Sequence, residues 1–301
     1  MHKNNFDFLR LTFAIFVVIT HSYTLSGVED CDILCQLTSE QVSLSTLGVR
    51  GFFIISGFLI FQSLMRSSDL TDYYWKRVLR LYPALFIVLL LTVLLAPFVY
   101  NGTAPFFFNK HALMYLPRNL SLFKLQYSIE GVFDNNPYAS AINGALWTIR
   151  YEFLFYIILS GLIFLRTNIF VVRGLLFSSF LILFILPYIL DEGVSSYNFF
   201  SINVKHFLDL GLLFIAGALL ASVKAENLKH RNKILFLSGF SVIVLTYFNL
   251  FNQLQYFILP VVVILFGLKS TKHLNNVGSV IGDLSYGIYI YSFPIQQTLM
   301  H

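Results

Sequence analysis

Nine long apolar runs constrain this chain more than any other feature of its sequence. They lie near residues 7–27, 46–65, 81–100, 147–165, 170–190, 205–223, 233–249, 254–268 and 279–300. A helix needs about 20 mostly apolar residues to cross a membrane, so each run predicts one span. Charged residues make up only 12% of the 301 residues, against roughly 25% in soluble domains. The sequence therefore excludes a water-soluble globule and predicts an all-α, polytopic membrane bundle of about nine helices.

The distribution of basic residues predicts the orientation of the bundle. With a cytoplasmic N-terminus, 14 of the 20 Lys and Arg residues fall on the cytoplasmic side and six fall outside, as the positive-inside rule requires. The net charge of +5 lies mostly between spans, so we expect membrane lipids and no nucleic acid as partners. The first run carries Asp7, Arg10 and His21 and lacks a cleavage site of small residues, which indicates a retained helix.

The only long polar connection lies at about 101–146. It contains turn formers such as Asn101-Gly102 and Asn143-Gly144, so we expect an outer loop or small lid on a single domain of residues 1–301. Cys31 and Cys35, the only cysteines, permit one local disulfide outside the cytoplasm. Two unpaired thiols are the alternative, because so short a ring is tight, and a metal site needs more ligands.

Ionisable residues inside apolar helices are the best pointers to function. Each costs about 2.5–3.5 kcal/mol at mid-membrane unless it is paired or lies in a water-filled cavity. Arg10 and His21 are separated by close to three full helical turns, so we expect both to face one cavity, with Arg10 near its cytoplasmic mouth. His21 could instead be a packing histidine bonded to a neighbouring carbonyl.

A basic pair precedes the third apolar run. Arg77 and Arg80 lie three residues apart, in what we expect to be a cytoplasmic loop, and on a helical turn they would form a fork suited to phosphate oxygens. Taken alone, the same residues also fit a basic, aromatic anchor at the membrane edge.

A second charged pair stands at the outer start of the fourth run. Arg150 and Glu152 are two residues apart, so they do not face each other and need different partners. Glu152 could orient or charge-balance the imidazole of His21, or it could pair with Arg50 or another buried cation.

Five motifs, taken in order across about 290 residues, resemble the membrane-bound acyltransferase-3 family. They are Asn5-Phe6-Asp7-Phe8-Leu9-Arg10 followed by His21-Ser22, Arg50-Gly51-Phe52-Phe53-Ile54-Ile55-Ser56-Gly57, Tyr74-Trp75-Lys76-Arg77-Val78-Leu79-Arg80, Trp147-Thr148-Ile149-Arg150-Tyr151-Glu152 and Leu284-Ser285-Tyr286-Gly287-Ile288-Tyr289. Arg50 and Ser292 depart from the pattern, since many members carry an acid and a histidine at these positions.

The resemblance implies an enzyme of the bacterial inner (cytoplasmic) membrane. Such enzymes move acyl groups, often acetyl, from a cytoplasmic coenzyme A thioester to hydroxyls of cell-envelope glycans such as O-antigen, capsule or exopolysaccharide. The partners implied are acetyl-CoA or another acyl-CoA as donor substrate and a glycan or lipid-linked saccharide as acceptor, with no permanently bound cofactor. The family usually has ten spans, so we expect either a missing tenth helix or a shortened, inactive homologue.

The resemblance and the residues together suggest roles for individual side chains. His21 would act as a base or as an acyl-carrying nucleophile, and Glu152 would support it. Arg10, Arg77 and Arg80 would bind the anionic end of the donor. A thioester is already activated, so no metal is expected. Supporting positions within the motifs are Asp7, Ser56, Trp147, Arg150 and Tyr286.

Other classes of membrane protein explain less of the sequence. A transporter or flippase would account for the spans and buried charges, but its inverted repeats and paired broken helices are not found. A glycan polymerase would concentrate arginines in outer loops, whereas here they concentrate inside. A non-catalytic membrane scaffold remains the simplest alternative.

Overall fold

A computed structural model of the chain describes residues 4–28, 31–103, 105–190, 197–199, 201–278 and 283–301. Its regular structure is almost entirely helical, apart from the short antiparallel strands β1 (Asn198–Phe199) and β2 (Ile202–Asn203). The all-α membrane bundle expected from the sequence is therefore confirmed. The expected start of the last span, at 279, lies outside the described residues.

Nine long helices within the described ranges correspond to the nine apolar runs. They are α1 (Phe6–Ser26), α3 (Leu44–Arg66), α4 (Leu70–Leu95), α6 (Trp147–Ser160), α7 (Ile169–Ile189), α9 (Val204–Ser222), α10 (Arg231–Tyr247), α11 (Phe251–Gly267) and α13 (Ser285–Met300). The short elements are α2 (Ile33–Leu37), α5 (Lys110–Leu120) and the 3-10 turns η1 (Ala96–Val99), η2 (Phe106–Phe108), η3 (Gly144–Leu146), η4 (Gly161–Leu165), η5 (Ala225–Asn227) and η6 (Leu274–Asn276).

Six of these segments are long and apolar enough to cross a membrane in the described part of the chain. They are α1, α3, α4 with η1, α6 with η3 and η4, α7 and α9. The helices α10, α11 and α13 have 17, 17 and 16 residues, slightly under the usual length of a span. The chain is a multi-pass membrane protein by this criterion.

Hydrogen bonds between chain segments fit a path that alternates between two ends of the bundle. At one end, the Asn5 N–H donates to the Gly267 carbonyl at 2.8 Å. At the other end, the Gln41 side chain donates to the Thr246 carbonyl at 2.8 Å. We name the end that holds Asn5 the inner end and the opposite one the outer end, following the expected orientation.

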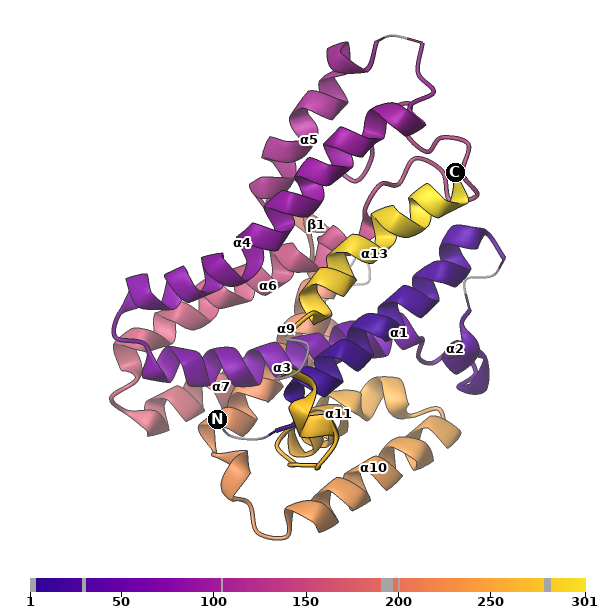
Figure 1. Ribbon diagram of the computed structural model, residues 1–301. Coiled ribbons are helices and arrows are strands. Elements are labelled where there is room, and N and C mark those ends of the chain that lie inside the picture. The colour runs from indigo at the N-terminus through magenta and orange to yellow at the C-terminus, as the bar shows by residue number, and fades with distance from the viewer. Residues whose placement is uncertain (1–3, 29–30, 104, 191–196, 200, 279–282) are drawn as a thin grey trace.

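The helix α3 crosses α9 with the two backbones in direct contact. A Cβ added to Gly57 would lie 1.9 Å from the Phe214 carbonyl oxygen, and one added to Gly217 would lie 2.2 Å from the Ile54 carbonyl oxygen. Small residues allow such close approach in membrane proteins. Figure 1 shows α10 and α11 along the lower edge of the bundle and α4 with α5 along the upper edge, with α3 between them.

The helix α4 starts earlier than the sequence indicated. It begins at Leu70 rather than near 81, so Arg77 and Arg80 lie inside a helix and the expected cytoplasmic loop is wrong. The reason is a cap: the Asp69 carboxylate accepts the Asp72 N–H at 2.8 Å, which satisfies a free donor of the first turn. Hydropathy alone placed the start at the first apolar residues.

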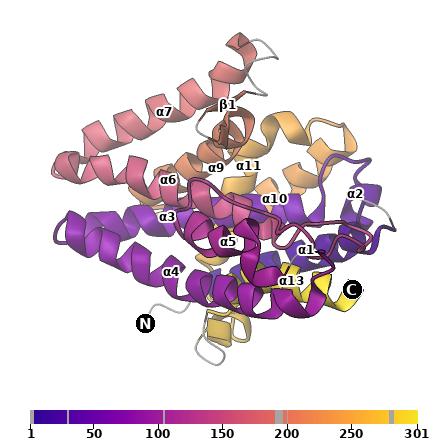
Figure 2. The same ribbon diagram turned by 90° about the horizontal axis from the view of Figure 1, so that it is seen from above.

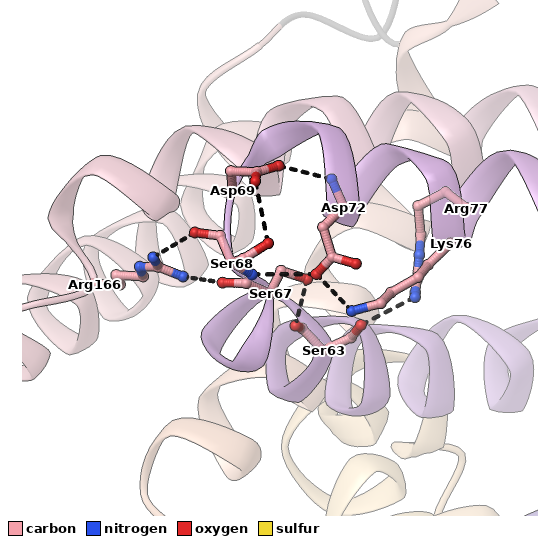
Figure 3. A network of polar contacts seen from close by, with 8 residues as sticks. All are labelled: Ser63, Ser67, Ser68, Asp69, Asp72, Lys76, Arg77 and Arg166. Atoms are coloured by element: carbon pink, nitrogen blue, oxygen red, sulfur yellow. Dashed lines mark hydrogen bonds and ion pairs between the residues drawn. The ribbon is translucent and has the colours of Figure 1, made fainter.

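The turn between α3 and α4 is tied to the inner end of η4. Arg166 donates to the carbonyl oxygens of Ser67 and Ser68, the latter at 2.9 Å (Figure 3). Lys76 pairs with Asp72 at 2.7 Å on the first turns of α4. These contacts fix the inner start of α4, from which Arg77 and Arg80 project.

The described residues of the segment 101–146 form a cap that includes α5. Figures 1 and 2 show α5 alongside the outer half of α4. The Asn136 side chain donates to Oε1 of Gln297 on α13 at 2.8 Å, and Tyr115 of α5 is fully buried. The expected loop therefore contains a helix and packs against two of the long helices.

The outer connection between α1 and α3 is fixed by a disulfide and a buried carboxylate. Cys31 and Cys35 are joined, with Cα atoms 5.3 Å apart, so the alternative of two free thiols is wrong. The carboxylate of Asp32 between them accepts the N–H groups of Cys35 at 3.0 Å and Leu44 at 2.8 Å. Asp32 therefore attaches this connection to the start of α3.

Candidate active site

A cavity of about 560 Å³ lies among the outer ends of the helices. Its walls come from α1, α3, α6, α7, α9, α11 and α13. The side chains with polar or ionisable groups in its lining include His21, Arg50, Trp147, Lys205, His206, Asp209, Tyr256 and Tyr289. We call it the outer cavity.

His21 of α1 lines the outer cavity, as its proposed role requires. Its ring packs edge-on against Phe293, with ring centroids 5.1 Å apart. Its buried Nδ1 atom has no hydrogen-bond partner among the described residues, so that nitrogen does not bind a neighbouring carbonyl. Arg10 does not line this cavity, and the structure does not place the two residues in one cavity.

A second, smaller cavity of about 40 Å³ lies next to the outer one. Its lining includes Ser56, Arg80, Glu152 and Tyr286. We call it the inner cavity. It joins residues from α3, α4, α6 and α13, so all four of the sequence motifs beyond the first helix meet around it.

The carboxylate of Glu152 is held within this inner cavity. Its Oε1 accepts hydrogen bonds from the Ser56 hydroxyl at 2.9 Å and from the Tyr156 hydroxyl. No hydrogen bond joins Glu152 to His21 in the part of the chain that the structure describes, and the two line different cavities. Glu152 thus faces α3 and α4 rather than the imidazole that the sequence suggested as its partner.

Val49 and Tyr289 line both cavities and form the wall between them. The Tyr289 hydroxyl lies 2.7 Å from the Thr148 hydroxyl, and the Tyr289 ring packs edge-on against Phe52 at 5.7 Å. A hydrogen bond between α6 and α13 thus holds the wall in place.

Two of the expected donor-binding arginines meet below the inner cavity at Asp283. The Asp283 carboxylate lies 3.2 Å from Arg10 and 3.8 Å from Arg80, and Asp7 lies 3.9 Å from Arg10. Burial raises the pKa of Asp283, but Arg10, the Ser285 hydroxyl and Arg80 together hold it below its usual value. This cluster lies at the inner end and places two guanidinium groups beside two carboxylates.

Arg77 has different partners from Arg80. Its guanidinium donates to the Ser63 hydroxyl at 3.0 Å and lies 5.5 Å and 5.8 Å from the ring centroids of Tyr73 and Tyr156. The two arginines therefore do not form the common fork that their spacing suggested. Arg77 packs against aromatic rings, whereas Arg80 faces the inner cavity.

The remaining supporting residues are spread over the bundle. Trp147 lines the outer cavity, with its ring centroid 4.7 Å from that of His206. The Tyr286 hydroxyl donates to the Leu81 carbonyl at 3.1 Å. Arg150 donates to the Tyr127 hydroxyl at 2.7 Å and to the Ser201 carbonyl, so it fastens the outer cap and lines neither cavity.

An ion pair also lies in the outer cavity. Arg50 Nε is 3.7 Å from Asp209 Oδ2, and the Tyr256 hydroxyl donates to Asp209 Oδ1 at 2.6 Å. Arg50 therefore pairs with Asp209 of α9 and not with Glu152.

Comparisons with known proteins identify the family of the chain. A family model described as an acyltransferase domain matches residues 3–301. The chain belongs to this acyltransferase family. It is 28% identical over 307 residues to an O-acetyl transferase of Shigella phage Sf6, covering 100% of this chain and 87% of the relative. It is also 33% identical over 172 residues to nodulation protein 10 of Rhizobium leguminosarum bv. viciae, covering 54% of this chain and 44% of that protein. No solved structure matches.

The candidate site includes charged residues that the sequence analysis did not select. Asp209 stands inside an apolar run, so the cost of a charge in a membrane could have marked it. Asp283 precedes the last motif, but its partner Arg10 is 273 residues away in sequence. Only the fold brings that pair together.

Proposed function

We propose that this membrane acyltransferase moves an acetyl group from acetyl-CoA at its inner side to a hydroxyl of an extracytoplasmic polysaccharide. The observation that carries the proposal is the pair of adjacent cavities. One contains His21 near the outer end, the other contains Arg80 and Glu152, and Tyr289 stands between them. This arrangement suits a donor and an acceptor that approach from opposite ends.

The arginine cluster at Asp283 would receive the anionic part of the donor. Guanidinium groups bind phosphate oxygens through paired, charge-assisted hydrogen bonds. Arg10 and Arg80 are now bound by one carboxylate, and donor phosphates would compete with it. Glu152, held by Ser56, would offset the charge of Arg80 beside the thioester.

The transfer itself needs one proton carrier. The imidazole of His21 takes the proton from the acceptor hydroxyl while the hydroxyl oxygen attacks the thioester carbonyl carbon. The new C–O ester bond forms, the C–S bond breaks, and coenzyme A leaves as a thiolate. The imidazolium then returns its proton to the thiolate, so His21 is regenerated and the products are the ester and free thiol.

Sealed vesicles of known orientation test this proposal. Radiolabelled acetyl-CoA supplied at the inner face should acetylate polysaccharide held at the opposite face, without net movement of the polysaccharide. His21→Ala should abolish labelling, whereas His111→Ala, a histidine of α5 that lines neither cavity, should retain it.

Three outcomes would contradict the proposal or a part of it. Labelling only when donor and acceptor share one face would exclude transfer through the bundle, and movement of polysaccharide without acetylation would favour a transporter. Normal labelling by His21→Ala would exclude the imidazole as the proton carrier.

A further inference from the structure

Arg50 is a largely buried cation whose hydrogen bonds are incomplete. Its side chain is only 13% exposed, and its Nε and Nη1 atoms have no hydrogen-bond partner among the residues described. The nearest carboxylate oxygen, Asp209 Oδ2, is 3.7 Å from Nε, beyond hydrogen-bond distance. The other oxygen of Asp209 already accepts from Tyr256. A buried, charged N–H group without a hydrogen-bond acceptor costs free energy. A bound molecule that accepts hydrogen bonds would satisfy the free N–H groups of Arg50.

The charges around Arg50 favour an anion as the molecule that accepts its hydrogen bonds. The outer cavity that it lines also contains Lys205, against the single carboxylate of Asp209, so the charged side chains of its described lining are positive in sum. His21 lines the same cavity. A molecule bound to Arg50 would therefore lie beside the imidazole.

We infer that the acceptor of the acyl group is an acidic saccharide. Its oxyanion, a carboxylate or a phosphate, binds Arg50 while one of its hydroxyls faces His21. A guanidinium matches such oxyanions with two parallel hydrogen bonds. Asp209, held by Tyr256, is then a positioning residue that orients Arg50. The inference rests on the proposed function, because it names the acceptor class of the same site.

Three glycosides that differ only at carbon 6 provide the test. They are methyl glucuronoside, methyl glucoside 6-phosphate and neutral methyl glucoside. The chain has two tryptophans: Trp147 lines the outer cavity, and Trp75 is exposed on the inner half of α4. In a Trp75→Phe background, Trp147 fluorescence therefore reports binding directly, without any donor present.

We expect at least one acidic glycoside to bind about tenfold to a hundredfold more tightly than the neutral one, the range typical of hydrogen bonds to a charged group. The stronger of the two identifies carboxylate or phosphate. Arg50→Gln should abolish the preference. Arg118→Gln, which removes an outer-end cation from α5 away from both cavities, should preserve it.

Equal binding of all three glycosides, or a preference that survives Arg50→Gln, would overturn the inference. If Arg50→Gln does not fold, Arg50→Lys keeps the charge without the paired geometry and should retain only part of the preference. Retention of the full preference by the lysine variant would also count against the inference. A binding preference for acidic glycosides without any acetyl transfer would instead contradict the proposed function.

Discussion

The contact between α3 and α9 makes Gly57→Ala a direct test of the packing described here. The added Cβ would lie 1.9 Å from the Phe214 carbonyl oxygen, so the helices must separate by about 1.5 Å to reach an ordinary contact of 3.4 Å. A carbonyl cannot rotate away as a side chain can. Overpacking of this kind costs about 1–3 kcal/mol, and the better helix propensity of alanine returns up to about 1 kcal/mol. We therefore expect a net loss of about 1–2 kcal/mol.

Gly239→Ala is the matched control. Gly239 also lies inside a long helix, α10, but an added Cβ there meets no atom within 4 Å. Melting curves of the two variants in detergent should show a lower melting temperature than the parent for Gly57→Ala. Gly239→Ala should melt at the same temperature as the parent or slightly higher, because only the helix propensity changes there. Equal melting temperatures would refute the claim that the two backbones touch.

Three further predictions concern charged residues. Arg80→Ala should raise KM for acetyl-CoA about tenfold to a hundredfold, whereas Arg77→Ala, which removes packing on aromatic rings, should mainly lower the melting temperature. Steady-state kinetics and melting curves measure the two effects. Similar KM values for both variants would contradict the different roles given to the two arginines. Because the pKa of Asp283 is lowered in the folded chain, its stabilising contribution is present above the unfolded pKa of about 3.9 and is lost as pH falls through the folded value. Asp283→Asn should thus be less stable than the parent at pH 7, with the difference shrinking on acidification in a melting series. Asp32→Ala should lower the melting temperature more than Cys31→Ser. The disulfide closes only a short loop and stabilises the fold by about 2 kcal/mol, whereas Asp32 is fully buried and accepts hydrogen bonds from several backbone N–H groups. The reverse order of melting temperatures would show that the disulfide contributes more stability than Asp32.

Local sequence predicted the elements of the fold better than the contacts between them. Each apolar run became a long helix because twenty apolar residues have few alternatives in a membrane. The start of α4 was missed because its first turns are polar and depend on the cap at Asp69. Helix α5 was missed because turn-forming residues surround it in an otherwise polar segment.

In the candidate site, too, the sequence predicted single residues better than the contacts between them. His21 could be selected because ionisable groups in apolar helices mark cavities, and Arg80 because its spacing from Arg77 suits phosphate oxygens. Each of the two lines a cavity. Their partners could not be selected, since helical periodicity gives the face of a residue but not the helix opposite. Glu152 therefore was assigned to His21, whereas the fold gives it Ser56.

The wall at Tyr289 has a consequence for the size of the group transferred. The inner cavity beside it measures about 40 Å³, room for roughly three water molecules at about 10–15 Å³ each. A two-carbon acyl group fits such a space, whereas a long fatty acyl chain would have to displace Tyr289 and break its hydrogen bond with Thr148. The side chain that separates the two cavities would thus also limit the length of the donor's acyl group. The enzyme would then select short acyl groups because longer ones do not fit, and not because it binds short ones more tightly.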